Sequence, residues 1–204
     1  MKKFTFTAIA VAVGLTFSAG AMAGTISKSD YKAGMNSIAA EYKSDKAICE
    51  SLSGNANDVC EAEAKGKEKV AKADLEARNK NTNKARYEAL VTKAEVDYSV
   101  AKEKCDDQAG NVKDVCLKEA KAAETAAKAD AKSQMKISKA SKKADKESAE
   151  VSKEEKDESA DARQDAATDK RDANYAVAKE KCDALAGGAK DSCVNEAKLH
   201  YGKM

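Results

Sequence analysis

Apolar residues recur along this chain at helical spacing, but the stripes that they form are narrow. From about Ser29 onward an apolar side chain appears at steps of four, three, four and seven residues, at Tyr31, Met35, Ile38, Tyr42 and Cys49. These steps place the side chains on one face of a helix. Ser29 is a candidate N-cap for this helix, and Gly34 weakens its first turns.

The next stretches also follow helical spacing, with one clear break between them. A helix from the Gly54 turn to about Arg78 has a sparse apolar stripe, and Gly66 interrupts it. Residues 79–83 contain three asparagines and a threonine, which favour turn and cap conformations over helix. Helix then resumes with the densest stripe in the chain, formed by Tyr87, Leu90, Val91, Ala94, Tyr98, Ala101 and Cys105.

No glycine or proline occurs between Gly110 and Gly187, so residues 112–186 are able to form a single helix. At 1.5 Å per residue such a helix would be about 110 Å long. Its middle part, residues 139–172, consists mostly of Lys, Glu, Asp, Ser and Ala. This part is either an isolated charged helix or a frayed linker, and the pattern leaves both open.

One pattern of 24 residues occurs three times, at residues 42–65, 98–121 and 175–198. Aligned on its first cysteine, each copy has a tyrosine seven residues earlier and a glycine five residues later. An aspartate follows nine residues after that cysteine, a second cysteine eleven residues after it, and Glu-Ala-Lys closes the copy. Matches at so many fixed offsets indicate an internal structural repeat.

Each copy is predicted to be a helical hairpin closed by a disulfide. Gly54, Gly110 and Gly187 suit the left-handed position that ends a helix, and Asn55 and Asn111 can cap the next helix. Cysteines at equal distances from a turn lie at equal heights in an antiparallel helix pair. Of the fifteen pairings that six cysteines allow, this spacing selects Cys49–Cys60, Cys105–Cys116 and Cys182–Cys193.

The repeated tyrosines, Tyr42, Tyr98 and Tyr175, share a helix face with the first cysteine of their copy. We interpret their rings as cover for the disulfide and as filling for the seam between the two helices. A tyrosine poised for redox chemistry beside the disulfide is the alternative.

Residues 1–23 have the features of a secretory signal peptide. Lys2 and Lys3 precede a mostly apolar run that ends at Phe17, and Ala21-Met22-Ala23 forms an A-x-A cleavage site. Cleavage after Ala23 would leave a periplasmic or secreted chain, and an oxidising compartment of this kind favours disulfides. No later segment is apolar for the roughly 20 residues that a membrane span needs.

Removal of this segment leaves a chain with no Phe, Trp or Pro and with 35 basic residues against 35 acidic ones. Because large apolar residues are scarce, a thick core is not available. Abundant Ala, Lys and Glu without proline favour extended helix over disorder. Nucleic acids and anionic lipids select a net basic face, so a net charge of zero argues against both as partners.

The sequence also lacks the residue patterns of common catalytic and metal sites. His200 is the only histidine, so it cannot build a triad or a metal site by itself. Zinc would need four ligands at short spacing, and neither CxxC nor a Cys–His cluster occurs. The carboxylates lie in solvated charge runs, and no glycine-rich phosphate loop is present. We predict no enzyme activity, no cofactor and no metal, with the six cysteines as the only site residues.

The third copy reads Tyr175-Ala-Val-Ala-Lys-Glu-Lys-Cys182, followed by a glycine turn and Asp-x-Cys193. In this pattern, over nearly the whole mature length, the chain resembles a group of exported, Ala/Lys-rich bacterial proteins with repeated Cys-x10-Cys hairpins. Such proteins are often labelled as similar to TolA, a cell-envelope protein with a long Ala/Lys/Glu helix. The sequence shows neither the N-terminal membrane anchor of TolA nor a match to its C-terminal domain. The resemblance implies an envelope setting and brings no activity with it.

We therefore expect an elongated all-α fold with a thin core, in which three disulfide-stapled helical hairpins are joined by long charged helices. The expected segments are a signal peptide at 1–23, a first hairpin at 24–78, a break at 79–83, a second hairpin at 84–138, a charged helix or linker at 139–172 and a third hairpin at 173–204.

The function that these features favour is a non-enzymatic spacer or scaffold of the periplasm, whose partner is another envelope protein or a second copy. A chaperone-like or polyanion-binding module is the alternative, and a thiol redox or metal-buffering stress protein is a third possibility. Holding a client requires exposed apolar area, of which the sequence offers little, so the spacer is preferred.

Overall fold

The computed structural model describes residues 25–144 and 149–203, which form six α-helices. They are α1 (Lys28–Cys49), α2 (Asn55–Lys80), α3 (Asn83–Cys105), α4 (Gly110–Ala144), α5 (Ala149–Cys182) and α6 (Gly187–Tyr201). The expected all-α fold, with three disulfide-stapled hairpins and a thin core, is confirmed. The signal peptide expected at 1–23 lies outside the described residues.

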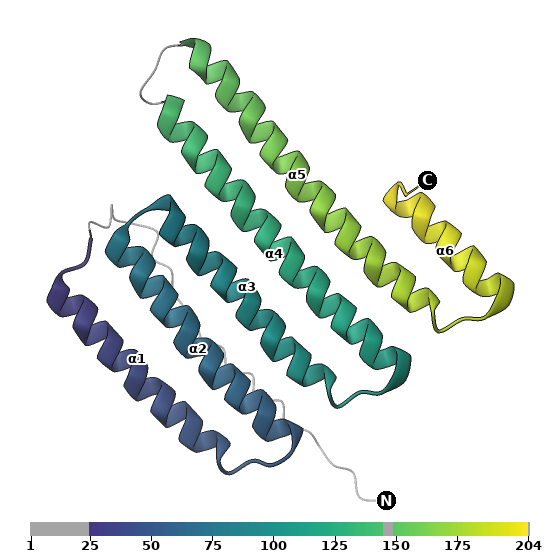
Figure 1. Ribbon diagram of the computed structural model, residues 1–204, viewed down its shortest axis with the longest axis horizontal. Helices are drawn as coiled ribbons and strands as arrows, with labels where there is room; N and C mark the ends of the chain where they lie inside the picture. The colour runs from purple at the N-terminus through teal and green to yellow at the C-terminus, as the bar shows by residue number, and fades with distance from the viewer. Residues whose placement is uncertain (1–24, 145–148, 204) are drawn as a thin grey trace, which may run out of the picture.

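The six helices lie side by side in one layer, in the order of the sequence (Figure 1). Each helix runs antiparallel to the one before it, and among the described helices each contacts only its neighbours in the sequence. The three turns that carry the disulfides lie along one edge of the layer, and the α2–α3 connection lies along the opposite edge. The molecule is thus a plate one helix thick, and α4 and α5 extend beyond the other helices at that opposite edge.

The single helix that the sequence allows over residues 112–186 does not form. α4 ends at Ala144, and α5 begins at Ala149 and returns antiparallel along α4. Within the expected charged helix or linker at 139–172, residues 139–144 complete α4 and residues 149–172 belong to α5, and residues 145–148 lie outside the described part of the chain.

Small side chains explain why the two long helices pair. Four of the buried residues of α4 recur at steps of seven, four and seven, which places them on one helix face, and three small residues of α5 are also buried. Helices that meet at Ala and Ser can approach closely and gain dispersion contacts along the whole seam. These residues are Ala122, Ala129, Ser133 and Ala140 of α4 and Ser159, Ala162 and Ala166 of α5.

Opposite charges flank the same seam. Lys136 of α4 places its Nζ 2.9 Å from Asp165 of α5, and Lys170 of α5 lies 2.5 Å from Asp130 of α4. The hydrogen bond from Lys136 lowers the pKa of Asp165. Because these groups are partly exposed, each pair contributes little to stability.

The side chain of Glu124 is buried where α4 meets α3. Its side chain is 6% exposed and is held by Lys121 at 2.7 Å and by Lys128 at 2.8 Å. Lys128 also reaches Glu95 of α3, again at 2.8 Å. Burial alone would raise the pKa of Glu124, but the hydrogen bonds from the two lysines outweigh it and the pKa is lowered.

Two glycines inside helices permit close contacts between neighbours. A Cβ atom on Gly66 would lie 2.5 Å from Cγ1 of Val96 on α3, and one on Gly34 would lie 2.9 Å from Cδ2 of Leu75 on α2. The expectation that Gly66 interrupts its helix is wrong, since α2 is continuous through it. The close approach of α3 offsets the low helix propensity of glycine there.

Local capping fixes the helix ends near the N-terminus and at the break. Ser27, rather than the expected Ser29, caps α1, and its Oγ accepts from the Asp30 amide at 3.1 Å. At the break, Asn81 has φ 47° and ends α2, and Thr82 accepts from the Ala85 amide at 3.1 Å to begin α3. None of the helices in the described part of the chain is both long enough and apolar enough to cross a bilayer.

Candidate functional site

The six predicted site cysteines form three disulfides, one at each turn along the stapled edge of the plate. The Cα–Cα distances are 5.5 Å for Cys49–Cys60, 5.8 Å for Cys105–Cys116 and 5.7 Å for Cys182–Cys193. The first cysteine of each pair is no more than 1% exposed. Disulfides of this kind are typical of chains that mature in an oxidising compartment.

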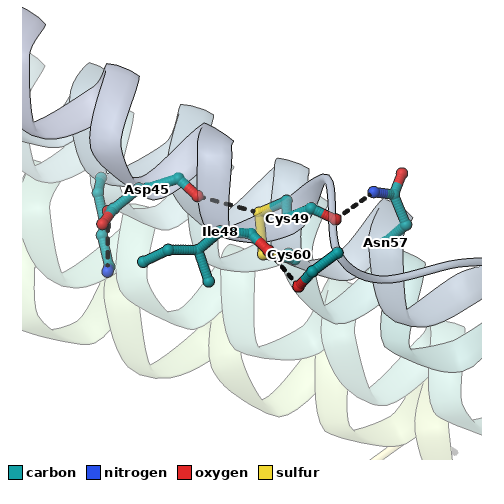
Figure 2. Close-up of a disulfide and its surroundings, with 7 residues drawn as sticks. Asp45, Ile48, Cys49, Asn57 and Cys60 are labelled. Atoms are coloured by element: carbon teal, nitrogen blue, oxygen red, sulfur yellow. Dashed lines mark hydrogen bonds and ion pairs between the residues drawn. A yellow bond between two sulfur atoms is a disulfide. The ribbon is translucent and has the colours of Figure 1, made fainter.

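The first turn shows how its backbone is held around the disulfide (Figure 2). The amide Nδ2 of Asn57 donates to the carbonyl oxygen of Cys49 at 2.8 Å, and the same oxygen accepts from the Leu52 backbone N–H at 2.9 Å. The Sγ of Cys49 lies 3.4 Å from the carbonyl oxygen of Asp45. Because a disulfide sulfur carries no hydrogen, this is a packing contact and not a hydrogen bond.

The turn glycines have the predicted left-handed φ but a different role. Gly54, Gly110 and Gly187 have φ values of 59°, 57° and 56°. Gly54 is the N-cap of α2, and Gly110 and Gly187 are the first residues of α4 and α6. The glycines therefore open the second helix of each hairpin instead of ending the first one.

The expected asparagine caps are wrong for the same reason. Gly54 takes the N-cap position with φ 59° and ψ −150°, a conformation open almost only to glycine, and Asn55 becomes the first residue of α2. Asn111 has a different partner, because its Nδ2 donates to the carbonyl oxygen of Glu180 on α5 at 3.1 Å. This bond connects the second and third hairpins at the stapled edge.

Two of the repeated tyrosines, Tyr98 and Tyr175, pack across seams of the plate, and the third, Tyr42, lines a groove described below. Lys121 of α4 places its Nζ 5.1 Å from the ring centroid of Tyr98 on α3. The ring of Tyr175 lies 6.2 Å from that of Tyr201 on α6. Seven residues correspond to about 10 Å along a helix axis, so these rings fill the seam roughly two turns from the cystine.

A groove crosses α1, α2 and α3 on one face of the plate, with a volume of about 740 Å³. α2 contributes small side chains between two flanking helices, so the surface dips along it. Apolar residues from all three helices line the groove: Ile38 and Tyr42 of α1, Ala64, Gly66, Val70 and Ala71 of α2, and Val96, Val100 and Ala101 of α3.

Charged residues surround this apolar lining, and acids outnumber bases. The six acids and three lysines are Glu41, Asp45, Glu63, Glu68, Asp74, Asp97, Lys67, Lys93 and Lys104. Each lysine is held by an acid: Lys67 lies 3.1 Å from Asp45, Lys104 lies 2.7 Å from Glu63 and Lys93 lies 2.6 Å from Asp97.

Asp74 is an exposed acid at the rim of the groove. Partial loss of water around its carboxyl group raises its pKa, although the positive charges of Lys93 and Arg78 act in the opposite direction.

A smaller hollow of about 420 Å³ lies across α4, α5 and α6. Its charged residues are Glu119 and Lys181, which pair at 2.7 Å, so its lining is electrically neutral. The two hollows occupy comparable places in the plate, and only the groove over α1–α3 has an acidic rim.

The groove is the feature that the sequence did not predict. Periodicity shows which residues share a helix face but not where a surface dips between three helices. The available signal was the set of small residues in α2, at Ala64, Gly66 and Ala71. His200 is exposed, and the centroid of its ring lies 4.6 Å from that of the Tyr201 ring, in an edge-to-face arrangement. No cluster of three or more metal-binding side chains occurs among the described residues.

Comparisons with protein-family profiles, with curated proteins and with solved structures give no match for this chain. Its function is therefore inferred from its own geometry and charge.

Proposed function

We propose that this protein is a non-enzymatic interaction scaffold of the bacterial cell envelope. The observation that carries this proposal is the plate of helices held by three disulfides along one edge. Most domains cover a helix layer with a second layer. A layer of single-helix thickness leaves two broad faces for other proteins, and the staples keep neighbouring helices in register.

A scaffold fits the dimensions better than a long spacer does. A single helix over residues 112–186 would reach about 110 Å, whereas α4, with 35 residues, is about 52 Å long. Because α5 folds back along α4, the charged region is roughly half as long as a single helix would be and two helices wide. The periplasm is the proposed location, from the signal-like residues 1–23 and from the disulfides.

Among the alternatives, a client-binding or chaperone-like role gains support from the groove, because its lining exposes apolar side chains that the sequence alone did not bring together. Polyanion binding is less favoured, since Lys128 and Lys136 of the lysine-rich part of α4 are held by acids of the neighbouring helices. Thiol exchange is less favoured too, because attack requires access to sulfur and the first cysteine of each pair is buried, which leaves only the half-buried second cysteine open to attack.

Cross-linking in cells tests the scaffold. The full chain is exported in a bacterial host and treated with a lysine-reactive cross-linker, and its partners are recovered and quantified. The matched control is the variant in which all six cysteines are serine. We expect one or a few envelope proteins to be recovered with the native chain and to be at least fivefold depleted with the control. Equal recovery with both chains, or no reproducible partner, would contradict the scaffold.

A further inference from the structure

We propose that the groove over α1–α3 binds one amphipathic helix of a partner protein, in which lysine or arginine residues flank the apolar stripe. This inference rests on the proposed scaffold function and adds the chemistry of its partner.

The groove is long enough for a short helix. On α2 its lining runs from Glu63 to Asp74, and on α3 from Lys93 to Lys104. Eleven helical steps correspond to about 16 Å, or three turns. A helix docked in such a groove would present anchors at positions i, i+3 or i+4, and i+7, which span about 10 Å and fit within this length. The apolar lining between α1 and α3 is suited to receive them.

The charges of the groove also favour a basic partner. The three lysines of the lining are each engaged by an acid, at Asp45, Glu63 and Asp97, and three further acids remain in the lining. Of these, Glu68 pairs with Lys72 at 2.6 Å, Asp74 is exposed and faces the positive charges of Lys93 and Arg78, and Glu41 is exposed on the rim. The groove thus has an excess of negative charge that a basic helix complements and an acidic helix does not.

A second copy of this chain does not supply a suitable insert. The large exposed apolar residues of the described part of the chain are scattered over different helices and turns, and no single helix presents them at steps of three, four and seven. They are Ile48, Leu52, Leu90, Val112, Leu185 and Leu199. A separate partner with a continuous apolar stripe is the occupant that fits.

The probes for the test are three synthetic peptides of 15 residues with helix-favouring sequences. The basic peptide has leucines on one face and lysines on the flanks, and the acidic peptide replaces these lysines with glutamates. The third peptide keeps the lysines but has serines in place of the leucines. Fluorescence anisotropy measures binding of each labelled peptide to the oxidised protein lacking residues 1–23, at about 0.15 M salt. Hydrogen exchange then locates the bound peptide.

We expect the basic peptide to bind at least tenfold more tightly than either of the others, with new protection at residues 63–74 and 93–104. The variant Glu41→Lys/Asp74→Lys should weaken binding of the basic peptide at least tenfold and strengthen binding of the acidic peptide. Its matched control is Asp157→Lys/Asp169→Lys, two exposed acids of α5 with the same change in net charge, and this control should bind as the native chain does.

Equal binding of the basic and acidic peptides, or equal losses in the two lysine variants, would overturn the inference, because either result indicates nonspecific attraction. Protection at another surface, or self-association that occludes the groove, would overturn it as well. The scaffold can fail separately: cross-linked partners without peptide selectivity contradict only the groove, and selective peptide binding without any cellular partner contradicts only the scaffold.

Discussion

The third turn places two adjacent glycines in different backbone states. Gly187 has φ 56°, in the left-handed region, whereas Gly188 has no positive φ, and a Cβ atom at either position would meet nothing within 4 Å. Any difference between alanine substitutions at these two sites therefore reports backbone conformation alone.

We expect Gly187→Ala to lower the free energy of unfolding by about 1–2 kcal/mol, the cost of a left-handed alanine. Gly188→Ala is the control and should leave stability unchanged or raise it by about 0.4–1 kcal/mol, because alanine restricts the unfolded chain. Urea unfolding monitored by circular dichroism measures both variants. Equal effects at the two sites would show that φ is not what requires glycine at position 187.

At Gly66, helix propensity and side-chain packing predict opposite effects of an alanine substitution on stability. Propensity predicts that Gly66→Ala stabilises α2 by about 1 kcal/mol, whereas the 2.5 Å approach to Val96 predicts a loss of about 1–3 kcal/mol from overpacking. We expect packing to dominate. A double-mutant cycle with Val96→Ala checks the cause, since removing the clashing methyl groups should recover part of the loss. A stabilised Gly66→Ala variant would contradict the close α2–α3 contact.

At the scale of the helix pair, one disulfide closes each of the hairpins α1–α2, α3–α4 and α5–α6. We expect Cys105→Ser with Cys116→Ser to loosen the central hairpin by about 2–4 kcal/mol, the usual range for a disulfide. Hydrogen exchange should show protection lost mainly around residues 98–121. The corresponding variant at Cys49 and Cys60 is the control and should affect residues 42–65 instead. Loss of protection across the whole plate in either variant would indicate one cooperative core.

The α3–α4 pair also depends on pH through Glu124. Its pKa is lowered in the folded state, so the unfolded chain binds more protons, and this contribution is complete above its ordinary value of 4.5. It is lost as the pH falls below that value and through the lowered pKa. Glu124→Gln should therefore destabilise the protein by about 1–3 kcal/mol at pH 7, with a smaller difference from the native chain at pH 3. Guanidinium unfolding at both pH values measures the stability of the variant and of the native chain. An equal stability difference at pH 7 and pH 3 would show that the charge of the Glu124 carboxylate is not the cause.

Sequence spacing predicted the hairpins because a disulfide and a positive-φ glycine both impose fixed offsets on neighbouring residues. The break at Asn81 and Thr82 was predictable for a similar reason, because its residues favour cap conformations. The return of α5 along α4 was not, since no glycine, proline or asparagine occurs in residues 145–148. Ala and Ser occur throughout these helices, so the sequence alone does not show which of them form the contact between α4 and α5.

The whole molecule should behave in solution as a plate and not as a rod. Six helices at 8–10 Å spacing span about 50 Å, and α4 is about 52 Å long. Small-angle scattering should give a largest dimension of roughly 70 Å, the diagonal of such a plate, together with a strongly helical far-UV spectrum. A largest dimension above about 110 Å, which residues 112–186 would reach as one straight helix, would contradict the pairing of α4 with α5.

The connection of each helix only to its sequence neighbours also has a consequence for biosynthesis. Every disulfide joins a cysteine to the next cysteine along the chain, eleven residues later. An oxidant that acted on the cysteines in the order of their synthesis would thus produce the native pairs directly, without reshuffling. Each completed hairpin would also present a side to which the next helix in the sequence can pack, so the chain can fold from its N-terminal end to its C-terminal end.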